Sequence, residues 1–403
     1  MLNIKEIRDF FPPLNRVDEN GNQIIFLDGP GGTQVPIQVI EAISQYYLRS
    51  NANTHGEFVT SRETDLYMDD LRKKMTIFFG AENPGCVSIG QNMTTLNYAL
   101  ARALSRKFNP GDEVVITDLD HEANRGPWKV LEEAGVKLIE VKLLNKGVLD
   151  YDDFQNKINN KTVLVCMGMS SNALGTLNDF KKVKSFLPKE CLFLLDAVHY
   201  APHFSINVQK LGCDFMLCSA YKFYGPHVGF LYSRKGVLDS LETDRLIVQD
   251  QSAPYKIETG TLNHAACAGV SAAIDFIADI GDGDSYRSKL EDAYNKISTH
   301  EHLLAKKLHN ALMQIDTVTI IGPDFSTTLR TPTVSFVHKK YSANEVCKRL
   351  AALNICAWDG HFYALKAIQS LGLEDKGGVT RLGVSVYNTD EEIDKVIEAI
   401  KSI

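Results

Sequence analysis

Between residues 113 and 233 the sequence repeats one pattern, in which a short and mostly uninterrupted apolar run is followed by a polar or helical stretch. A strand with one solvated face would instead alternate apolar and polar residues. The runs are EVVIT at 113–117, VKLIEV at 136–141, TVLVCMGM at 162–169, CLFLLD at 191–196, CDFMLCS at 213–219 and VGFLYS at 228–233. Because such strands are buried on both faces, the pattern predicts a mainly parallel sheet covered by helices.

Segments with helical periodicity precede and separate these runs. Apolar residues recur every three or four positions in DLYMDDLRKKMTIFFG (65–80) and in TTLNYALARALSRKF (94–108), which predicts two amphipathic helices. The stretches GPWKVLEEAG (126–135) and NDFKKVKSFL (178–187) predict further helices between strands. Strands that alternate with helices are typical of an α/β fold.

The pattern changes after about residue 280, where GDGDS interrupts the periodicity. The elements predicted beyond it are a long helix at 285–315, strands at 318–322 and 333–338, a helix at 342–353, a strand at 380–387 and a closing helix at 390–402. This order is an α+β arrangement. We therefore predict a large domain over residues 20–275 and a smaller domain formed by residues 1–19 and 276–403.

Charge and hydropathy argue against several classes of protein. Fifty acidic and 43 basic residues give a net charge of −7, whereas a nucleic-acid-binding domain usually carries a basic face. No apolar run reaches the roughly 18 residues that a membrane-spanning helix needs. The first fifteen residues are too charged for a signal peptide. We expect a cytoplasmic protein that binds neither nucleic acid nor membrane.

The eight cysteines are scattered along the chain. They form no C-x-x-C pair and no Cys/His spacing typical of a zinc site, so no metal site is predicted. Several lie inside apolar runs such as CDFMLCS, which predicts buried, reduced thiols.

Polar residues follow several predicted strands, at the edge of the sheet where open α/β proteins bind ligands. Asp196 ends CLFLLD, Lys222 follows CDFMLCS, and His121 lies shortly after EVVIT. Asn92 and Thr94 precede a predicted helix, where backbone N–H groups can hold a phosphate. Each alone has an ordinary structural interpretation, such as a surface lysine, a helix N-cap or a loop histidine. Together they are the parts of a pyridoxal phosphate site.

Longer motifs carry a specific resemblance. The segments SAYKFYGPHVGF (219–230), DAVHYAPH (196–203), DHEANRGPW (120–128) and SNALGT (171–176) resemble motifs of the class V aminotransferase family, in its cysteine desulfurase-like branch. The similarity extends over nearly the whole chain, from LDGPGGTQVP to SVYNTDEEID. It implies a fold-type I pyridoxal phosphate enzyme, with a seven-stranded, mainly parallel sheet between helical layers and a smaller C-terminal α+β domain.

The resemblance also implies roles for individual residues. It makes Lys222 the Schiff-base lysine, Asp196 the partner of the pyridine nitrogen and His121 the residue stacked on the cofactor ring. Further cofactor contacts are implied for Asn92, Met93, Thr94, Asn172, His199, which replaces the usual glutamine, Ser219 and Thr261. Arg381 resembles the arginine that pairs with the substrate carboxylate, and His55, His361 and Tyr363 are further candidates for substrate binding. Thr261 resembles a threonine that reaches the partner subunit's phosphate site, which implies a homodimer.

One departure from the family pattern affects the expected chemistry. Desulfurases carry a nucleophilic cysteine on a loop that reads G-H-x-C in one common branch, and the matching segment here, DGHFYAL, has Tyr363 at that position. Tyrosine cannot form a persulfide. Cys356, seven residues earlier, is a candidate substitute in a predicted strand. Two other changes, Tyr221 before the lysine and Gly56 after His55, are expected to affect substrate choice more than fold.

Two reaction classes remain open. The first is C–S bond cleavage by β-elimination from a small cysteine-derived amino acid, through an external aldimine, which needs Lys222 but no enzyme thiol. The second is transamination or epimerisation, similar to an isopenicillin N epimerase, which begins with the same loss of the Cα proton. We favour the lyase because the motifs are most similar to the desulfurase-like branch. A non-catalytic protein of this fold would not need Asp196, Lys222, His121 and Arg381 together.

Overall fold

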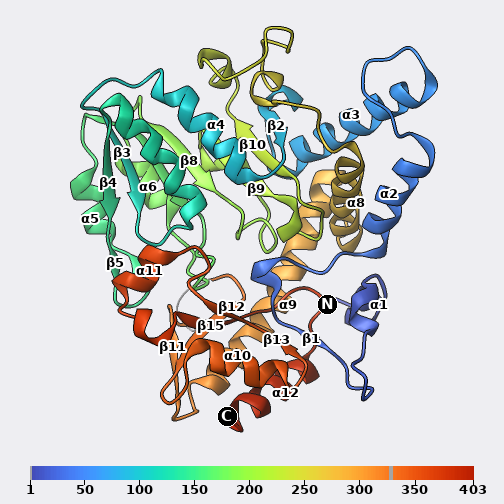
Figure 1. Ribbon diagram of the computed structural model, residues 1–403, viewed down its shortest axis with the longest axis vertical. Helices are drawn as coiled ribbons and strands as arrows, with labels where there is room; N and C mark the ends of the chain where they lie inside the picture. The colour runs from blue at the N-terminus through green and yellow to red at the C-terminus, as the bar shows by residue number, and fades with distance from the viewer. Residues whose placement is uncertain (1, 326–329) are drawn as a thin grey trace.

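The computed structural model describes residues 2–325 and 330–403, and its largest element is a seven-stranded sheet (Figure 1). The strand order is β2-β10-β9-β8-β7-β3-β4. The strands are β2 (Val87–Gly90), β3 (Glu113–Thr117), β4 (Lys137–Val141), β7 (Thr162–Gly168), β8 (Leu192–Asp196), β9 (Phe215–Ser219) and β10 (Gly229–Ser233). Only β10 runs antiparallel to its neighbours, β2 and β9, so the predicted mainly parallel α/β sheet is confirmed.

Successive residues of the central strands point into two separate cores. On β7, Leu164 and Cys166 belong to the core beneath α4, whereas Val165 and Met167 belong to the core beneath α3 and α8. Both faces of the sheet are therefore covered, which explains why the sequence shows uninterrupted apolar runs. The helices of this part are α2 (Ile37–Arg49), α3 (Val59–Phe79), α4 (Met93–Ser105), α5 (Tyr151–Lys157), α6 (Phe180–Phe186), α7 (Val208–Leu211) and α8 (His264–Ile280).

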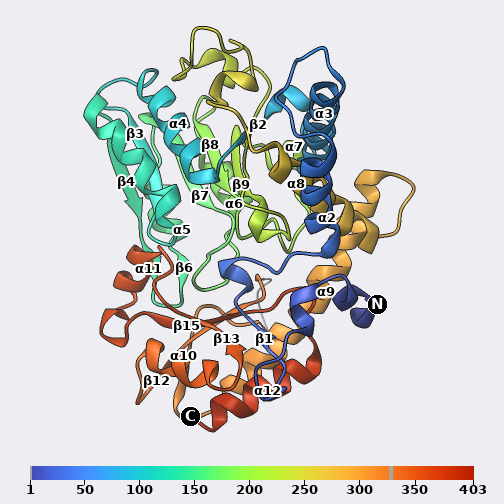
Figure 2. The ribbon, with the colours of Figure 1, turned by 45° about the vertical axis from the view of Figure 1, so that its right-hand side comes forward.

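A second sheet lies below the first in Figures 1 and 2 and is antiparallel, with the order β11-β12-β15-β14. The strands of this sheet and the helices around it are α9 (Tyr286–Leu312), β11 (Val318–Ile321), β12 (Thr333–His338), α10 (Ala343–Ala351), β14 (Trp358–Gly360), α11 (Leu365–Ser370), β15 (Val379–Gly383) and α12 (Asp390–Lys401). A third core of apolar side chains fills the space between this sheet and α9, α10 and α12.

The N-terminal segment contacts this C-terminal part. Strand β1 (Ile25–Phe26) pairs in parallel with β13 (Ile355–Cys356), and helix α1 (Ile4–Asp9) is tied to α12 by an ion pair between Arg8 and Glu392, whose atoms lie 2.8 Å apart. The division of the chain into residues 20–275 on one side and 1–19 with 276–403 on the other stays a prediction. A small hairpin of β5 (Leu143–Leu144) and β6 (Val148–Leu149) completes the strands.

Two predicted elements differ from the structure. Residues Gly126–Ala134 form a 3₁₀ helix with Pro127 in its first turn, where an α-helix was expected. The strand expected over 380–387 ends at Gly383, because the backbone then turns and the Asn388 side chain accepts a hydrogen bond from the Ser385 amide. In the described part of the chain, no helix is long and apolar enough to cross a membrane.

Candidate active site

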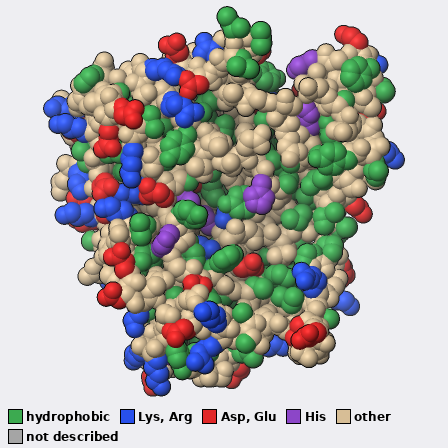
Figure 3. Space-filling model, in the orientation of Figure 1, with side chains coloured by type: hydrophobic (Ala, Val, Ile, Leu, Met, Phe, Trp, Pro, Cys, Tyr) green, Lys and Arg blue, Asp and Glu red, His purple; other side chains and the backbone are tan. Residues whose placement is uncertain are grey.

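A cavity of about 640 Å³ lies at the carboxyl ends of the parallel strands, between the two sheets. Lys222 follows β9, His121 follows β3, Asn172 and His199 follow β7 and β8, and Arg381 projects from β15. In Figure 3, histidine side chains gather near the middle of the face that shows the junction between the two parts. Here the structure brings together residues from distant parts of the sequence, from Pro30 and Gly31 to Arg381.

Lys222 is buried, and its ammonium has no carboxylate partner within ion-pair distance among the described residues. Its Nζ donates to the carbonyl oxygens of Pro30, at 2.5 Å, and Gly31, at 3.1 Å, and lies 4.6 Å from the centre of the Tyr221 ring. Burial, followed by the positive charge of Arg381, lowers the pKa of Lys222 to about 7. A substantial fraction of the amine is therefore neutral and nucleophilic near pH 7.

Asp196 ends β8 and is buried beside a second carboxyl group, that of Asp120. The Asp196 Oδ1 accepts a 2.9 Å hydrogen bond from the Val198 amide, and Asp120 Oδ1 accepts one of 2.6 Å from the amide of Gly168, which is paired with Asp196 in the sheet. Burial raises the pKa of Asp196 to about 6 and that of Asp120 to about 7. Asp196 thus needs a positive or hydrogen-donating partner to hold its charge, which a protonated pyridine nitrogen would supply.

His121 and His199 face the same cavity as neutral rings. The His121 Nδ1 accepts a 2.9 Å hydrogen bond from the Ala123 amide, so Nε2 carries the ring proton. Burial, with the charges of Lys222 and Arg381, lowers the pKa of His121 to about 4 and places that of His199 well below its usual range. A neutral ring is suited to stacking on an aromatic cofactor.

Arg381 is buried and lines the cavity on the side opposite the strand ends. Its Nη1 donates to the Asn172 carbonyl oxygen at 2.8 Å, and its guanidinium lies 3.8 Å from the centre of the Phe362 ring. Burial lowers the pKa of Arg381 to about 9, although the carboxylate of Asp28 opposes this shift. Within the described residues the buried Arg381 Nε and Asn172 Oδ1 have no hydrogen-bond partner, which is the state expected of groups that await a polar ligand.

The N-terminus of α4 approaches the strand ends closely. Asn92 caps this helix by accepting from the Thr95 amide at 2.9 Å, Met93 is its first residue, and Thr94 lines the cavity. A Cβ on Gly229 would collide with the backbone of Asn92 and Met93. A helix N-terminus with a threonine hydroxyl suits a phosphate group. Ser219, at the end of β9, pairs with Gly229 across the sheet.

Together these groups fit pyridoxal phosphate. The aldehyde would meet the uncharged Lys222, the pyridine nitrogen would meet Asp196, and the phosphate would meet the N-terminus of α4. The orphaned side-chain oxygen of Asn172 and Nε of Arg381 would gain partners from the cofactor or its substrate. The strands already hold these groups in positions where they can contact the cofactor.

The loop after β14 closes the cavity on the side of the small sheet. Tyr363 lines the cavity with its ring centre 5.4 Å from that of His121, and Phe362 lies next to it. His361 does not line the cavity; its Nδ1 accepts a 3.0 Å hydrogen bond from the Tyr363 amide. The position at which desulfurases carry a cysteine thus presents a phenol.

None of the eight cysteines lines this cavity. All are free thiols; seven are buried, as predicted, and Cys356 is half-buried. Burial raises the pKa of every one of them, that of Cys356 to about 11. Cys356 lies within β13, paired with Phe26 of β1, so neither its position nor its pKa suits the nucleophile considered from the sequence.

His55 and Thr261 do not reach the Lys222 cavity of their own chain. They line a second cavity of about 430 Å³ with Arg72 and Glu258. In that cavity Arg72 and Glu258 form a buried ion pair of 2.8 Å, and His55 adopts a left-handed backbone conformation with φ of 66°. Within one chain, then, these two predicted residues form a separate group.

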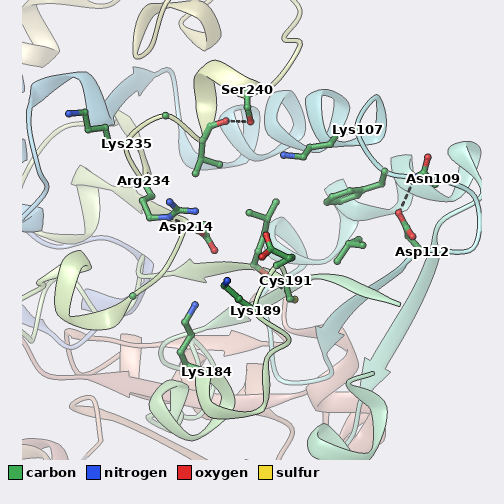
Figure 4. A pocket seen from close by; sticks show the side chains of 17 residues that line it. Lys107, Asn109, Asp112, Lys184, Lys189, Cys191, Asp214, Arg234, Lys235 and Ser240 are labelled. Atoms are coloured by element: carbon green, nitrogen blue, oxygen red, sulfur yellow. Dashed lines mark hydrogen bonds and ion pairs between the residues drawn. The ribbon is translucent and has the colours of Figure 1, made fainter. Parts of the chain in front are cut away.

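A cavity larger than the one around Lys222 lies at the amino ends of the parallel strands (Figure 4). Its volume is about 820 Å³, and basic side chains such as Lys107, Lys184 and Lys189 line it together with Asp112 and Asp214. It contains no residue of the predicted site, so size alone does not identify the catalytic cavity. The convergence of perturbed titratable groups favours the Lys222 cavity as the candidate active site.

Several cavity residues were missed from the sequence. They are Tyr98, Glu122, Lys129, Trp358 and Phe362, together with the Pro30 and Gly31 carbonyls that hold Lys222. The backbone carbonyls could not be identified, because any residue has one. Tyr98 lies one helical turn after Thr94 on α4, and that spacing was the one available signal.

Comparisons with known proteins identify the family of this chain. The sequence profile of the family described as aminotransferase class-V matches residues 25–396. A probable cysteine desulfurase of Halalkalibacterium halodurans is 32% identical, with 99% of this chain and 98% of that protein aligned. The chain belongs to the class V aminotransferase family. A second relative, the aminotransferase-like protein FGM3 of Gibberella zeae, is 31% identical over 100% of this chain and 98% of its own length.

Solved structures show the same fold. The apo structure of a cysteine desulfurase from Thermococcus onnurineus superposes with a TM-score of 0.89 at 26% identity, covering 100% of this chain and 98% of that one. The cysteine desulfurase CsdA of Escherichia coli gives a TM-score of 0.86 at 23% identity, over 100% and 98% of the two chains. The class V aminotransferase fold and the relatives confirm a pyridoxal-phosphate-dependent enzyme that is similar to cysteine desulfurases.

Proposed function

We propose that this class V aminotransferase-family enzyme is a C–S lyase. It removes the Cα proton of a small cysteine-derived amino acid and expels the sulfur substituent from Cβ. One observation carries the choice of elimination over desulfuration: the loop position beside His121 is Tyr363, and no cysteine lines the cavity. With all eight thiol pKa values raised by burial, a persulfide route has no thiolate to begin it.

Three residues of the candidate site have separate roles in the proposed reaction. Arg381 binds the substrate carboxylate, since its buried Nε lacks a partner in the described part of the chain. That contact orients the bond to the Cα hydrogen toward Lys222, whose amine takes the proton because its pKa is lowered to about 7. When bound, pyridoxal phosphate supplies the electron sink for the pair released at Cα. Asp196 holds the positive charge on the pyridine nitrogen that makes this sink effective.

The proposal includes a homodimer. His55 and Thr261 line a cavity remote from their own Lys222, and a neighbouring chain could receive them into its phosphate site. Helices α2 and α3 nearby expose Tyr47, Leu48, Phe58, Val59 and Leu66, a set of large apolar side chains that an interface would bury. The eight free thiols further support a reducing, cytoplasmic location.

Product analysis tests the proposed function. The purified holoprotein is incubated with cysteine, cystine and S-ethylcysteine, and the products are identified. Pyruvate and ammonia with a released thiol are expected. Alanine with sulfide would indicate desulfuration, a keto acid with aminated cofactor transamination, and Cα isotope exchange without net product epimerisation. Any of these three as the main outcome contradicts the lyase assignment.

Two lysine variants provide matched controls. Lys222→Ala is expected to lose both turnover and the covalent linkage to the cofactor, seen as the loss of the yellow absorbance. Lys235→Ala removes a lysine from the basic cavity at the opposite edge of the sheet and is expected to keep both. Because both changes remove one positive charge, a difference between them reports the chemistry of Lys222.

A further inference from the structure

The loop that carries Tyr363 has an unusual backbone. Phe362 and Tyr363 both have positive φ values, 51° and 59°, and Gly360, two residues before Phe362, has a φ of 117°. For residues with a side chain, each left-handed position costs on the order of 1 kcal/mol. Two such aromatic residues in succession are held in place only if the surroundings impose this conformation.

Three hydrogen bonds impose it, and all of them involve the catalytic cavity or the loop itself. The Asn172 side-chain amide donates to the Phe362 carbonyl oxygen at 2.7 Å, and the Glu122 amide donates to that of Tyr363 at 2.7 Å. The Tyr363 amide donates to His361 Nδ1 at 3.0 Å. The loop is thus bound to the segments that follow β3 and β7, which also carry His121 and Asn172.

The result is a phenol fixed at the mouth of the cavity. The Tyr363 side chain is 67% exposed, so little apolar packing offsets the backbone cost. Its ring lies beside His121, and among the described residues none forms a hydrogen bond with its hydroxyl. A strained residue that contributes little to the core and presents a free proton donor to the site suggests a role in the reaction.

We propose that the Tyr363 hydroxyl is the general acid that protonates the departing sulfur. This role rests on the proposed β-elimination. As Lys222 takes the Cα proton, the electron pair left at Cα forms the Cα–Cβ double bond, and the C–S bond breaks with its pair going to sulfur. The phenol gives its proton to that sulfur, so a neutral thiol leaves. The enamine product is hydrolysed to pyruvate and ammonia, Lys222 releases the Cα proton to solvent, and solvent returns a proton to the phenolate.

Three other titratable groups of the cavity are less suited to the task. His121 is a neutral ring at pH 7, since burial and two nearby cations lower its pKa to about 4, and a neutral imidazole is a very weak acid. Lys222 is already assigned to the Cα proton. The Arg381 guanidinium is held by the Asn172 carbonyl and is assigned to the substrate carboxylate.

Substrates that differ in their leaving group test this role. An alkyl thiolate needs a proton as it leaves, whereas chloride does not. Initial rates of pyruvate formation are compared for S-ethylcysteine and β-chloroalanine with the wild-type holoenzyme and with Tyr363→Phe, which keeps the ring and loses only the hydroxyl. We expect the variant to be slowed about a hundredfold or more on S-ethylcysteine and less than about threefold on β-chloroalanine.

The outcomes separate this role from the proposed function. If the wild-type enzyme forms no pyruvate from S-ethylcysteine, the lyase assignment fails, and the role of Tyr363 fails with it. If the wild-type enzyme cleaves S-ethylcysteine, but Tyr363→Phe is equally active on it or is slowed equally on both substrates, only the acid role is overturned. The rate on β-chloroalanine and the cofactor absorbance show that the variant is folded and loaded.

Discussion

The Glu122 amide donates a 2.7 Å hydrogen bond to the carbonyl oxygen of Tyr363. This bond joins the loop after β14 in the small sheet to the segment that follows β3 in the large one, next to His121. Because this bond ties the loop to the segment that carries His121, it helps to fix where the phenol lies relative to that ring. The loop conformation is therefore part of the site.

Relieving the backbone strain at this loop is expected to separate stability from function. Tyr363→Gly places at φ of 59° the one residue that adopts it without steric cost, and the lost side chain is mostly exposed. We predict that the free energy of unfolding rises by about 1 kcal/mol while C–S cleavage is lost. Urea denaturation and pyruvate assays on the same preparation check this; a loss of stability would show that the ring contributes to packing.

A methyl group at Gly229 is expected to disrupt the phosphate site. In Gly229→Ala the new Cβ collides with the backbone of Asn92 and Met93, so the N-terminus of α4 must move. Overpacking of this kind costs about 1–3 kcal/mol, which corresponds to about a tenfold to hundredfold weaker affinity for pyridoxal phosphate. Equilibrium titration of the apo protein measures the affinity. Unchanged affinity with a lowered melting temperature would place the phosphate elsewhere.

The lowered pKa of Lys222 predicts a pH dependence for cofactor capture. Only the neutral amine attacks the aldehyde, so the rate of linkage to apo protein should rise up to pH about 7 and level off above it. Because the Arg381 charge contributes to the lowering, Arg381→Met should move the midpoint to higher pH, whereas Arg381→Lys should move it less. Stopped-flow absorbance between about pH 5.5 and 9.5 measures this rate, and a rate that still rises steeply at about pH 9.5 would show that the pKa of Lys222 is not lowered.

Asp120 is expected to make the protein less stable as the pH rises. Its folded pKa of about 7 exceeds the ordinary value of 3.8, so between these pH values the native state holds a proton that the unfolded chain has lost. The stability present below pH about 4 is therefore lost progressively up to pH about 7. Asp120→Asn has no such dependence, and its stability relative to wild type should improve over this range by up to about 4 kcal/mol. Urea unfolding at several pH values measures the difference, and a constant difference would contradict it.

Much of the large sheet could be predicted, because its signal is local. The run EVVIT coincides with β3, and the other five runs differ from their strands by one or two residues at an end. Strand β2 is only four residues long and was not recognised, and Gly126–Ala134 was taken for an α-helix because 3₁₀ and α periodicities are hard to distinguish over nine residues.

Some residues of the candidate site could be predicted from the sequence and others could not. Lys222, Asp196 and His121 follow strands and belong to motifs, so both position and chemistry identified them. The carbonyl oxygens of Pro30 and Gly31, and the carboxyl pair of Asp120 with Asp196, depend on which strands become neighbours. Such contacts between distant parts of the chain leave no periodic signal in the sequence.

The central claim, cleavage of a C–S bond without an enzyme thiol, is tested most directly by the mass of the intact protein during turnover with cysteine. We expect pyruvate to accumulate while neither the wild-type protein nor Cys356→Ser gains the mass of a sulfur atom, and we expect the two proteins to form pyruvate at the same rate. A protein that carries an added sulfur atom while alanine accumulates would contradict it, above all if Cys356→Ser abolished both.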